Sequence, residues 1–225
     1  MEAEVSTGLT EALEVTGSTV AGCGRKWPVD VVARQAGAGA NVGAPAPVRA
    51  AAALARFNAL PESEAAEALG ACCASRRWIA AVVAARPLGN DADLHRCAAA
   101  ELAALDWPDI LEALAAHPRI GERAAGAARD AAWSRAEQAG AADADARTAA
   151  ALAAANAAYE ARFGHVYLIR ATGRTAPQLL AAALGRLEHD EPTEQAVVRD
   201  ELSQIVRLRL DKLLLGLAEG TRPGW

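Results

Sequence analysis

Hydrophobic and polar residues follow a helical period along most of the chain, from about residue 56 to residue 215. Apolar residues recur every three to four positions, in runs that begin near Ser or Asp and end at Gly or before Pro, as amphipathic helices do. The only β-like run, residues 163–169, is too short to build a sheet by itself. We therefore expect an all-α fold, a single helical-bundle-like domain of about eight helices. The expected helices cover residues 61–73, 75–86, 91 or 93 to 102, 106–116, 131–139, 145–162, 176–188 and 192–215.

Local signals define several of these boundaries. Ser75 is placed to cap a helix N-terminus with its side-chain oxygen, and Asp106-Trp107-Pro108 starts the fourth helix. Pro118 disfavours a helical backbone at His117, so the fourth helix must end just before it. Gly140 is expected to close the fifth helix.

The first 50 residues differ in composition from the rest. Residues 35–47 consist almost entirely of Gly, Ala, Pro and other small residues, which cannot build a hydrophobic core. We predict a disordered extension at residues 1–50, followed by one helical domain at residues 51–220.

Charge and composition narrow the class of protein. The chain is 52% hydrophobic, but alanine dominates that figure, and alanine favours helices. A net charge of −5 argues against binding to nucleic acid or to an anionic membrane. Charged residues interrupt every apolar run well short of the ~20 residues that span a membrane. The acidic start, residues 1–4, lacks the features of a signal peptide, so we expect a soluble cytoplasmic protein.

The four cysteines form no C-x-x-C pair and no metal-binding spacing with the four histidines. Cys72 and Cys73 are adjacent on a helical run and are interpreted as small buried apolar residues. We expect neither a disulfide framework nor a metal site.

An arginine lies in the middle of the apolar stripe of the last predicted helix. At 100° per residue Arg209 falls among the core-facing residues, whereas Arg207 and Asp211 fall on the opposite face. The apolar members of the stripe are Val198, Leu202, Ile205, Val206 and Leu213. A buried guanidinium keeps its charge and needs an anion or a carbonyl oxygen beside it. Two interpretations follow: an internal salt bridge to Asp or Glu, or a fork for a substrate carboxylate or carbonyl.

A histidine follows the fourth helix at a fixed corner. His117 precedes Pro118, and the helix dipole at that end favours the protonated imidazole. It is either a polar helix end or an acid–base group that works near neutral pH. The other histidines are interpreted as ordinary polar or packing residues, namely His95, His165 and His189.

Three polar residues share one face of the fifth predicted helix. Ser134, Glu137 and Gln138 stand at positions i, i+3 and i+4. They form a binding face, a solvated face, or a capping box with Ser134 at the N-cap and Glu137 at N3. The chain lacks the H-E-x-x-H, Walker, G-x-S-x-G and G-x-G-x-x-G motifs, which argues against zinc-hydrolase, nucleotide-binding and serine-hydrolase functions.

Taken in order, these segments and several others resemble the OHCU decarboxylase family over about residues 55–216. OHCU is 2-oxo-4-hydroxy-4-carboxy-5-ureidoimidazoline. His-Pro-Arg-Ile-Gly alone is a weak signal, but the ordered set is specific. The matching segments are Phe57-Asn58-x-Leu60, Cys73-x-Ser75-x-x-Trp78, Arg86-Pro87, Leu94, His117-Pro118-Arg119-Ile120-Gly121, Ser134-x-x-Glu137-Gln138-x-Gly140, Asn156-x-x-Tyr159-x-x-Arg162-Phe163-Gly164 and Glu201-Leu202-x-x-Ile205-x-x-Leu208-Arg209-Leu210.

The resemblance implies an all-helical, homodimeric and cofactor-free carboxy-lyase of urate breakdown that yields (S)-allantoin, in a pathway with urate oxidase and hydroxyisourate hydrolase. It implies catalytic roles for His117, as the proton donor, and for Glu137 and Arg209. The implied substrate contacts are Pro118, Ser134, Arg135, Ala136, Glu137, Gln138 and Arg209, with the backbone of Ile169, Arg170, Ala171, Thr172 and Gly173. The sequence departs from the family in its long N-terminal extension and at His165, where some members carry an apolar residue or Phe.

The chemistry of OHCU suits such a set of residues. The carboxylate stands on a carbon next to a ring C=N, which accepts the electrons left by CO2, so neither an organic cofactor nor a metal is needed. Arg209 would hold an anionic or carbonyl oxygen, Glu137 and Gln138 the N–H groups, and His117 would move protons. The alternatives are a related enzyme acting on another ureido compound and a non-catalytic interaction module. The module is favoured if His117, Glu137 and Arg209 lie more than ~15 Å apart.

Overall fold

The computed structural model describes residues 46–122, 129–142 and 144–220. These residues form ten helices and no strand, which confirms the all-α prediction. The helices are α1 (Ala46–Ala59), α2 (Glu62–Gly70), α3 (Arg76–Ala84), α4 (Asp91–Ala103), α5 (Trp107–Ala115), α6 (Arg129–Glu137), α7 (Ala139–Ala142), α8 (Ala146–Phe163), α9 (Ala176–Arg186) and α10 (Glu191–Ala218). In the described part of the chain, no helix is long and apolar enough to cross a membrane.

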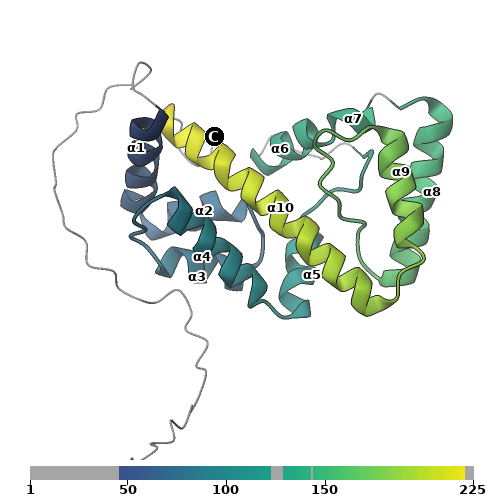
Figure 1. Ribbon diagram of the computed structural model, residues 1–225, viewed down its shortest axis with the longest axis horizontal. Helices are drawn as coiled ribbons and strands as arrows, with labels where there is room; N and C mark the ends of the chain where they lie inside the picture. Colours follow the sequence, from purple (N-terminus) through teal and green to yellow (C-terminus); the bar gives the residue numbers. More distant parts are fainter. Residues whose placement is uncertain (1–45, 123–128, 143, 221–225) are drawn as a thin grey trace, which may run out of the picture.

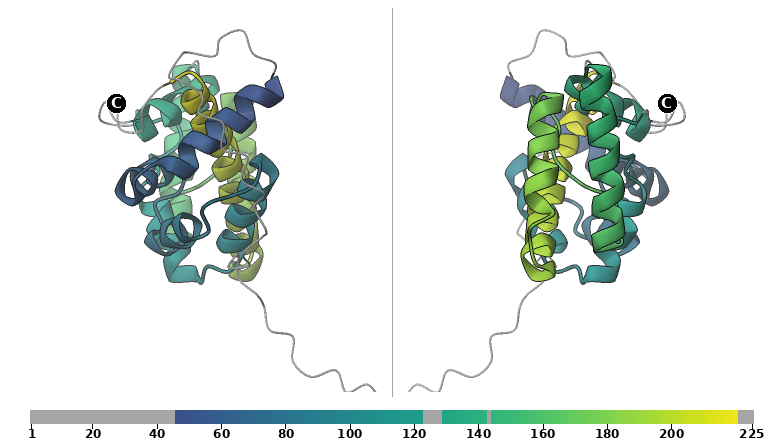
Figure 2. Two further views of the ribbon diagram at one scale, coloured as in Figure 1. Left: turned by 90° about the vertical axis from the view of Figure 1, so that its left-hand side faces the viewer. Right: turned by 90° about the vertical axis from the view of Figure 1, so that its right-hand side faces the viewer.

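The long helix α10 runs diagonally through the molecule and joins its two halves (Figure 1). Helices α1 to α4 lie at one side, where α10 packs against α1 and α4. Helices α8 and α9 lie side by side at the other side (Figure 2). The buried apolar residues form two clusters: a larger one from α1–α5 and α10, and a smaller one from α8, α9 and residues 167–171. The segment 165–174 therefore runs between the two clusters.

Two helices begin where the sequence predicted, and a side chain caps each of them. The Ser75 hydroxyl accepts a hydrogen bond from the Trp78 N–H at 3.3 Å, and the Asp106 carboxylate accepts one from the Asp109 N–H at 3.2 Å. Helix α4 begins at Asp91, one of its two predicted start positions, and its cap is Asn90. The amide oxygen of Asn90 accepts from the Asp93 N–H, which places both candidate aspartates inside the first turn.

The fifth predicted helix is two helices. Helix α6 ends at Glu137, and Gly140 lies inside the short helix α7 instead of closing α6. Ser134 lies within α6, so the capping-box interpretation is wrong. A Cβ at Gly140 would stand 2.2 Å from the carbonyl oxygen of Arg174, so only glycine permits this close approach of α7 to the segment 165–174.

Helix α1 begins within the predicted extension. Its residues Leu54 and Phe57 are fully buried, and it packs against α10. Arg56 donates to the carbonyl oxygens of Leu217 and Ala218 and so satisfies the C-terminal end of α10. The predicted disorder for residues 46–50 is therefore wrong, because tertiary packing stabilises an alanine-rich run that composition alone left unassigned. The same prediction for residues 1–45 lies outside the described residues.

Two truncations separate the extension from α1. Deleting residues 1–45 is expected to change the melting temperature by less than about 2 °C, because their composition cannot build a core. Deleting residues 1–59 also removes Leu54 and Phe57 from the core, which costs on the order of 5 kcal/mol or more. That loss lowers the melting temperature by roughly 10 °C or more. Thermal unfolding followed by circular dichroism measures both, and equal melting temperatures would contradict the role given to α1.

A buried ion pair joins α9 to α10. The Arg186 Nε donates to the Glu194 carboxylate at 2.8 Å, and the Tyr159 hydroxyl also donates to it. Arg186 further donates to the carbonyl oxygen of Leu168 at 2.7 Å, and His189 contacts the second carboxylate oxygen at 2.8 Å. Burial would raise the pKa of Glu194, but the hydrogen bonds from Arg186 and Tyr159 outweigh burial and hold this pKa below its usual range.

Removing the arginine of this pair is expected to destabilise the fold in a pH-dependent way. Arg186→Met strands the Glu194 carboxylate in the core, which costs about 3–5 kcal/mol at pH 7. Because the pKa of Glu194 is lowered in the native protein, its stabilisation is present above the unfolded pKa and lost as the pH falls. The difference in melting temperature between variant and wild type should therefore narrow as the pH falls. Protonation relieves the stranded carboxyl in the variant, and below about pH 4.3 the wild type loses its own stabilisation. A difference that stays constant with pH would show that lost packing, rather than charge, causes the effect.

Candidate active site

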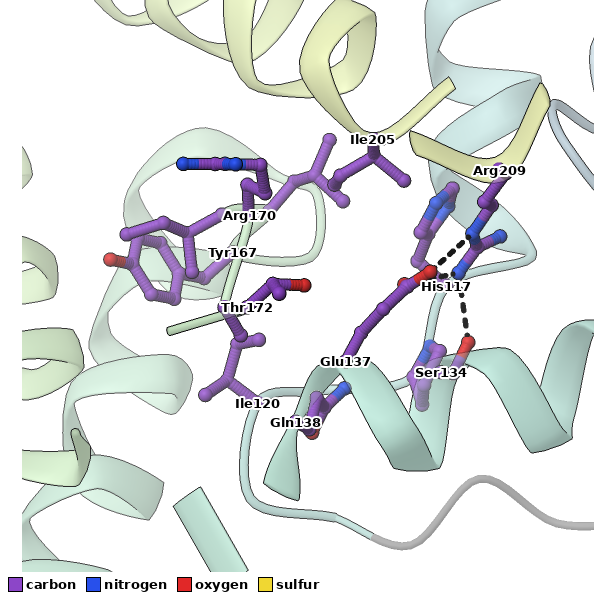
Figure 3. Close-up of a pocket in the computed structure, with 14 residues that line it drawn as sticks. His117, Ile120, Ser134, Glu137, Gln138, Tyr167, Arg170, Thr172, Ile205 and Arg209 are labelled. Carbon is purple, nitrogen blue, oxygen red and sulfur yellow. Dashed lines mark hydrogen bonds and ion pairs between the residues drawn. The ribbon is translucent and has the colours of Figure 1, made fainter. Parts of the chain in front are cut away.

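A pocket lies where the two apolar clusters meet, enclosed by the end of α5, helix α6, the segment 167–172 and α10 (Figure 3). It brings together ten of the thirteen residues that the sequence proposed. These are His117, Pro118, Ser134, Glu137, Gln138, Ile169, Arg170, Ala171, Thr172 and Arg209. His117, Glu137 and Arg209 thus line one small space, which argues against the interpretation as a non-catalytic module.

Three proposed residues do not line this pocket. Arg135 and Ala136 follow Ser134 on α6, where the helical turn carries them to the exposed side. Gly173 is exposed beyond the pocket and has a φ of +79°, which suits a glycine turn. Both α6 residues were included because the family resemblance implied the whole face from Ser134 to Gln138.

Four further residues line the pocket: Ile120, Tyr167, Leu168 and Ile205. Ile205 precedes Arg209 by one helical turn on the same stripe, so the sequence contained a signal for it. Ile120 belongs to the His117–Gly121 motif. Tyr167 and Leu168 belong to the β-like run, and only the tertiary fold brings them to the site.

Arg209 makes the internal ion pair that the sequence considered, and its partner belongs to the same pocket. The Arg209 Nε and one terminal nitrogen donate to the two oxygens of Glu137 at 3.2 and 2.9 Å (Figure 3). The same terminal nitrogen donates to the Ser134 hydroxyl at 3.0 Å, and the other to the carbonyl oxygen of Ala71 at 3.2 Å. These bonds use four of the five N–H groups of a guanidinium. The structure therefore confirms the internal ion pair, while the substrate fork stays a prediction.

Glu137 is held as a carboxylate. It is 8% exposed, and the Lys212 ammonium donates to its Oε1 at 2.9 Å in addition to the bonds from Arg209. Burial would raise the pKa of Glu137, but the neighbouring Arg209 and Lys212 cations outweigh burial and lower it. The sequence did not single out Lys212, which lies three residues beyond Arg209 and at the margin of the apolar stripe.

His117 follows the last turn of α5, as predicted from Pro118. Its Nδ1 lies 3.0 Å from the carbonyl oxygen of Ala113. A carbonyl only accepts, so Nδ1 carries a proton, and the other ring nitrogen, Nε2, is buried. The backbone therefore fixes both the tautomer and the orientation of the ring.

The turn after His117 is held by two side chains from elsewhere in the fold. Gln138, in the turn between α6 and α7, accepts a hydrogen bond from the Gly121 N–H at 3.0 Å through its amide oxygen. Asn156 of α8 donates to the carbonyl oxygen of Ile120 at 2.8 Å. Gly121 has a φ of +87°, which glycine adopts without strain.

Two charged side chains fix the position of the backbone of the segment 167–172. Glu201 of α10 accepts from the Arg170 N–H at 2.8 Å, while Arg186 of α9 holds the Leu168 carbonyl oxygen. The guanidinium of Arg170 points away from the Glu137–Arg209 pair (Figure 3).

The pocket is narrow. About 20 Å³ of it admits the centre of a water molecule, which is room for one water. A more open cavity of about 500 Å³ adjoins it and shares His117 and Pro118. Among the described residues no group of three or more His, Cys, Asp or Glu side chains is arranged to hold a metal ion.

The family of the chain follows from comparison with known proteins. The model of the OHCU decarboxylase family matches residues 58–211, which include every residue that lines the pocket. The chain belongs to the OHCU decarboxylase family. The resemblance drawn from the sequence motifs is thereby confirmed.

Curated relatives of this decarboxylase-family chain are larger proteins of uric acid degradation. It is 30% identical over 145 residues to the uric acid degradation bifunctional protein TTL of Arabidopsis thaliana, covering 63% of this chain and 45% of that protein. It is 28% identical over 149 residues to the uric acid degradation bifunctional protein PucL of Bacillus subtilis (strain 168), covering 66% of this chain and 30% of that protein. The chain thus spans less than half the length of these relatives.

Solved structures match this decarboxylase-family fold. A crystal structure of OHCU decarboxylase in the presence of (S)-allantoin superposes with a TM-score of 0.58 and 28% identity, covering 66% of this chain and 98% of the other. A crystal structure of (S)-allantoin synthase superposes with a TM-score of 0.56 and 19% identity, covering 71% of this chain and 53% of the other, and supports the fold alone.

Proposed function

We propose that this chain decarboxylates OHCU to (S)-allantoin without a cofactor, as a step of urate catabolism. One observation carries the proposal: His117, Glu137 and Arg209 line a single pocket in a chain of the OHCU decarboxylase family. The match to a solved OHCU decarboxylase over 98% of that chain supports it.

Each side chain has a defined part in this proposal. Arg209 holds a substrate oxygen, while Glu137 and Gln138 accept hydrogen bonds from the N–H groups of the ring and the ureido arm. When the bond from C4 to the carboxylate carbon breaks, CO2 leaves and the electron pair forms a C4=C5 double bond. The electrons of the ring C=N move to its nitrogen, which takes up a proton from solvent. The enol that results becomes allantoin by losing its C4 hydroxyl proton and gaining a proton at C5. His117 handles these protons through Nε2, since Nδ1 donates to Ala113.

The other substrate contacts follow the pocket. Pro118 and Ser134 line it beside the catalytic residues, as do Ile169, Arg170, Ala171 and Thr172 of the held segment. The backbone groups of that segment are the groups that we propose for substrate binding, because Arg170 directs its guanidinium away from the pair.

The proposal also covers the oligomeric state, the cellular location and the pathway of the protein. The family resemblance supports a cytoplasmic homodimer that works after urate oxidase and hydroxyisourate hydrolase. Sedimentation of the purified protein tests the dimer, and a monomer at micromolar concentration would contradict it.

A turnover assay tests the activity directly. OHCU is generated in solution and its ultraviolet signal is followed with and without the protein. Loss of the signal faster than the spontaneous decay, with (S)-allantoin as the product by circular dichroism, supports the proposal. Racemic allantoin formed at the spontaneous rate would contradict it, and turnover of a different ureido compound alone would favour a related enzyme.

A further inference from the structure

Glu137 has two cationic partners on α10. Arg209 contacts both of its carboxylate oxygens, and Lys212, three residues further along the helix, contacts Oε1 at 2.9 Å. The two cations therefore share one oxygen, while the other belongs to Arg209. The ammonium of Lys212 also lies 5.9 Å from the centre of the Trp133 ring of α6, so an aromatic face flanks it.

Arg209 has few N–H groups left to donate to a substrate. Its guanidinium already donates hydrogen bonds to Glu137, Ser134 and Ala71. A substrate oxygen that binds the fork of Arg209 competes with the carboxylate of Glu137 for the same N–H groups. With Arg209 as its only partner, Glu137 would then be stranded as a buried charge, which is strongly unfavourable.

We propose that Lys212 is a positioning residue. It keeps a hydrogen bond to the carboxylate of Glu137 while the N–H groups of Arg209 turn from Glu137 to donate to the substrate. This inference rests on the proposed function of the pocket. Lys212 suits the role because its side chain is 27% exposed, so its ammonium lies at the margin of the site rather than in the substrate space. It is absent from the pocket lining, whereas Arg209 is part of it.

Among the described residues that line the pocket, the other charged or titratable groups are not placed to hold the carboxylate of Glu137. His117 at the end of α5 lines the same pocket, but its Nδ1 is committed to the carbonyl oxygen of Ala113. Arg170 directs its guanidinium away from the Glu137–Arg209 pair. Among the described residues that line the pocket, Glu137 is the one carboxylate. Lys212 is thus the group placed to retain the charge of Glu137.

Three variants test the proposal. Lys212→Met removes the ammonium and keeps the length of the side chain, Lys212→Arg keeps a cation, and Arg207→Met removes one charge from the opposite face of α10. We expect Lys212→Met to raise KM for OHCU by roughly tenfold or more, with kcat changed far less, because the lost interaction is needed to release Arg209. Lys212→Arg should restore KM to within about threefold of wild type, and Arg207→Met should leave it unchanged.

The melting temperature separates this role from a structural one. Without substrate, Glu137 in Lys212→Met still pairs with Arg209. The melting temperature of Lys212→Met should therefore lie within about 3 °C of that of Arg207→Met. A lowered melting temperature with unchanged KM overturns the proposal, as does a KM equal to that of Arg207→Met or a failure of Lys212→Arg to restore it. If methionine prevents folding, Lys212→Gln replaces it under the same criteria.

A measurement without turnover distinguishes failure of this proposal from failure of the proposed function. Carbon-13 NMR of the Glu137 carboxyl gives its titration midpoint in Lys212→Met and Arg207→Met. Loss of a neighbouring cation should raise that midpoint in Lys212→Met alone. A wild type that does not turn over OHCU overturns the proposed function. Equal midpoints in the two variants overturn the inference about Lys212, whatever the activity.

Discussion

Replacing Arg209 by lysine is expected to reduce kcat/KM for OHCU by on the order of 100-fold while the protein stays folded. Lysine keeps a positive charge near Glu137 but cannot reproduce the planar fork, which donates to Glu137, Ser134 and Ala71 at once. Arg209→Ala is expected to reduce kcat/KM by about the same factor, since both variants lack the fork.

Stability distinguishes the two Arg209 variants. Arg209→Ala leaves the buried Glu137 with Lys212 alone, which costs up to about 3–5 kcal/mol. It should therefore lower the melting temperature by roughly 10 °C, whereas Arg209→Lys lowers it far less. The measurements are KM, kcat and the melting temperature, with Arg207→Lys and Arg207→Ala as matched controls on the same helix. Near-normal KM in Arg209→Lys would contradict the substrate role and leave Arg209 as a purely structural residue.

Replacing His117 by alanine is expected to lower kcat by a factor on the order of 10²–10⁴, the usual effect of removing a positioned proton-transfer group. His117→Asn is the sharper variant, because an amide N–H can still donate to the Ala113 carbonyl oxygen while the side chain no longer titrates. Both variants should retain the helical circular dichroism of the wild type.

The control for His117 is a histidine remote from the pocket. His95 pairs with Asp211 at 2.9 Å and does not line the pocket, so His95→Ala should leave kcat unchanged. Activity close to wild type in His117→Asn would exclude a proton-transfer role. Loss of helical signal in both variants would mean that His117 is needed for folding instead.

The sequence predicted the helices best where a side chain caps the end. Ser75 and Asp106 were identified by residue type, because a helix N-terminus leaves N–H groups that such side chains satisfy locally. Helix α1 was missed because it is stabilised by distant contacts, such as those of Arg56 with the end of α10. Helix α7 was missed because Gly140 is a signal for a helix end, whereas here it permits a close approach to Arg174.

The site was predictable in its parts but not in its connections. An arginine on an apolar stripe indicated a buried charge at Arg209, and Pro118 indicated that His117 ends a helix. The pairing of Arg209 with Glu137 joins residues 72 positions apart, so no local pattern could reveal it. Lys212 was missed for the same reason, since its partner lies on another helix.

The narrowness of the pocket affects how affinities of this protein must be interpreted. A ring bearing a carboxylate and a ureido arm does not fit into a space for one water, so the proposed function requires a wider form of this pocket. The apparent dissociation constant then equals the intrinsic constant divided by the fraction of molecules in the wider form. Substitutions that touch no substrate atom can therefore tighten or weaken binding by shifting this fraction alone. A measured KM consequently depends both on the strength of the substrate contacts and on the fraction of molecules in the wider form.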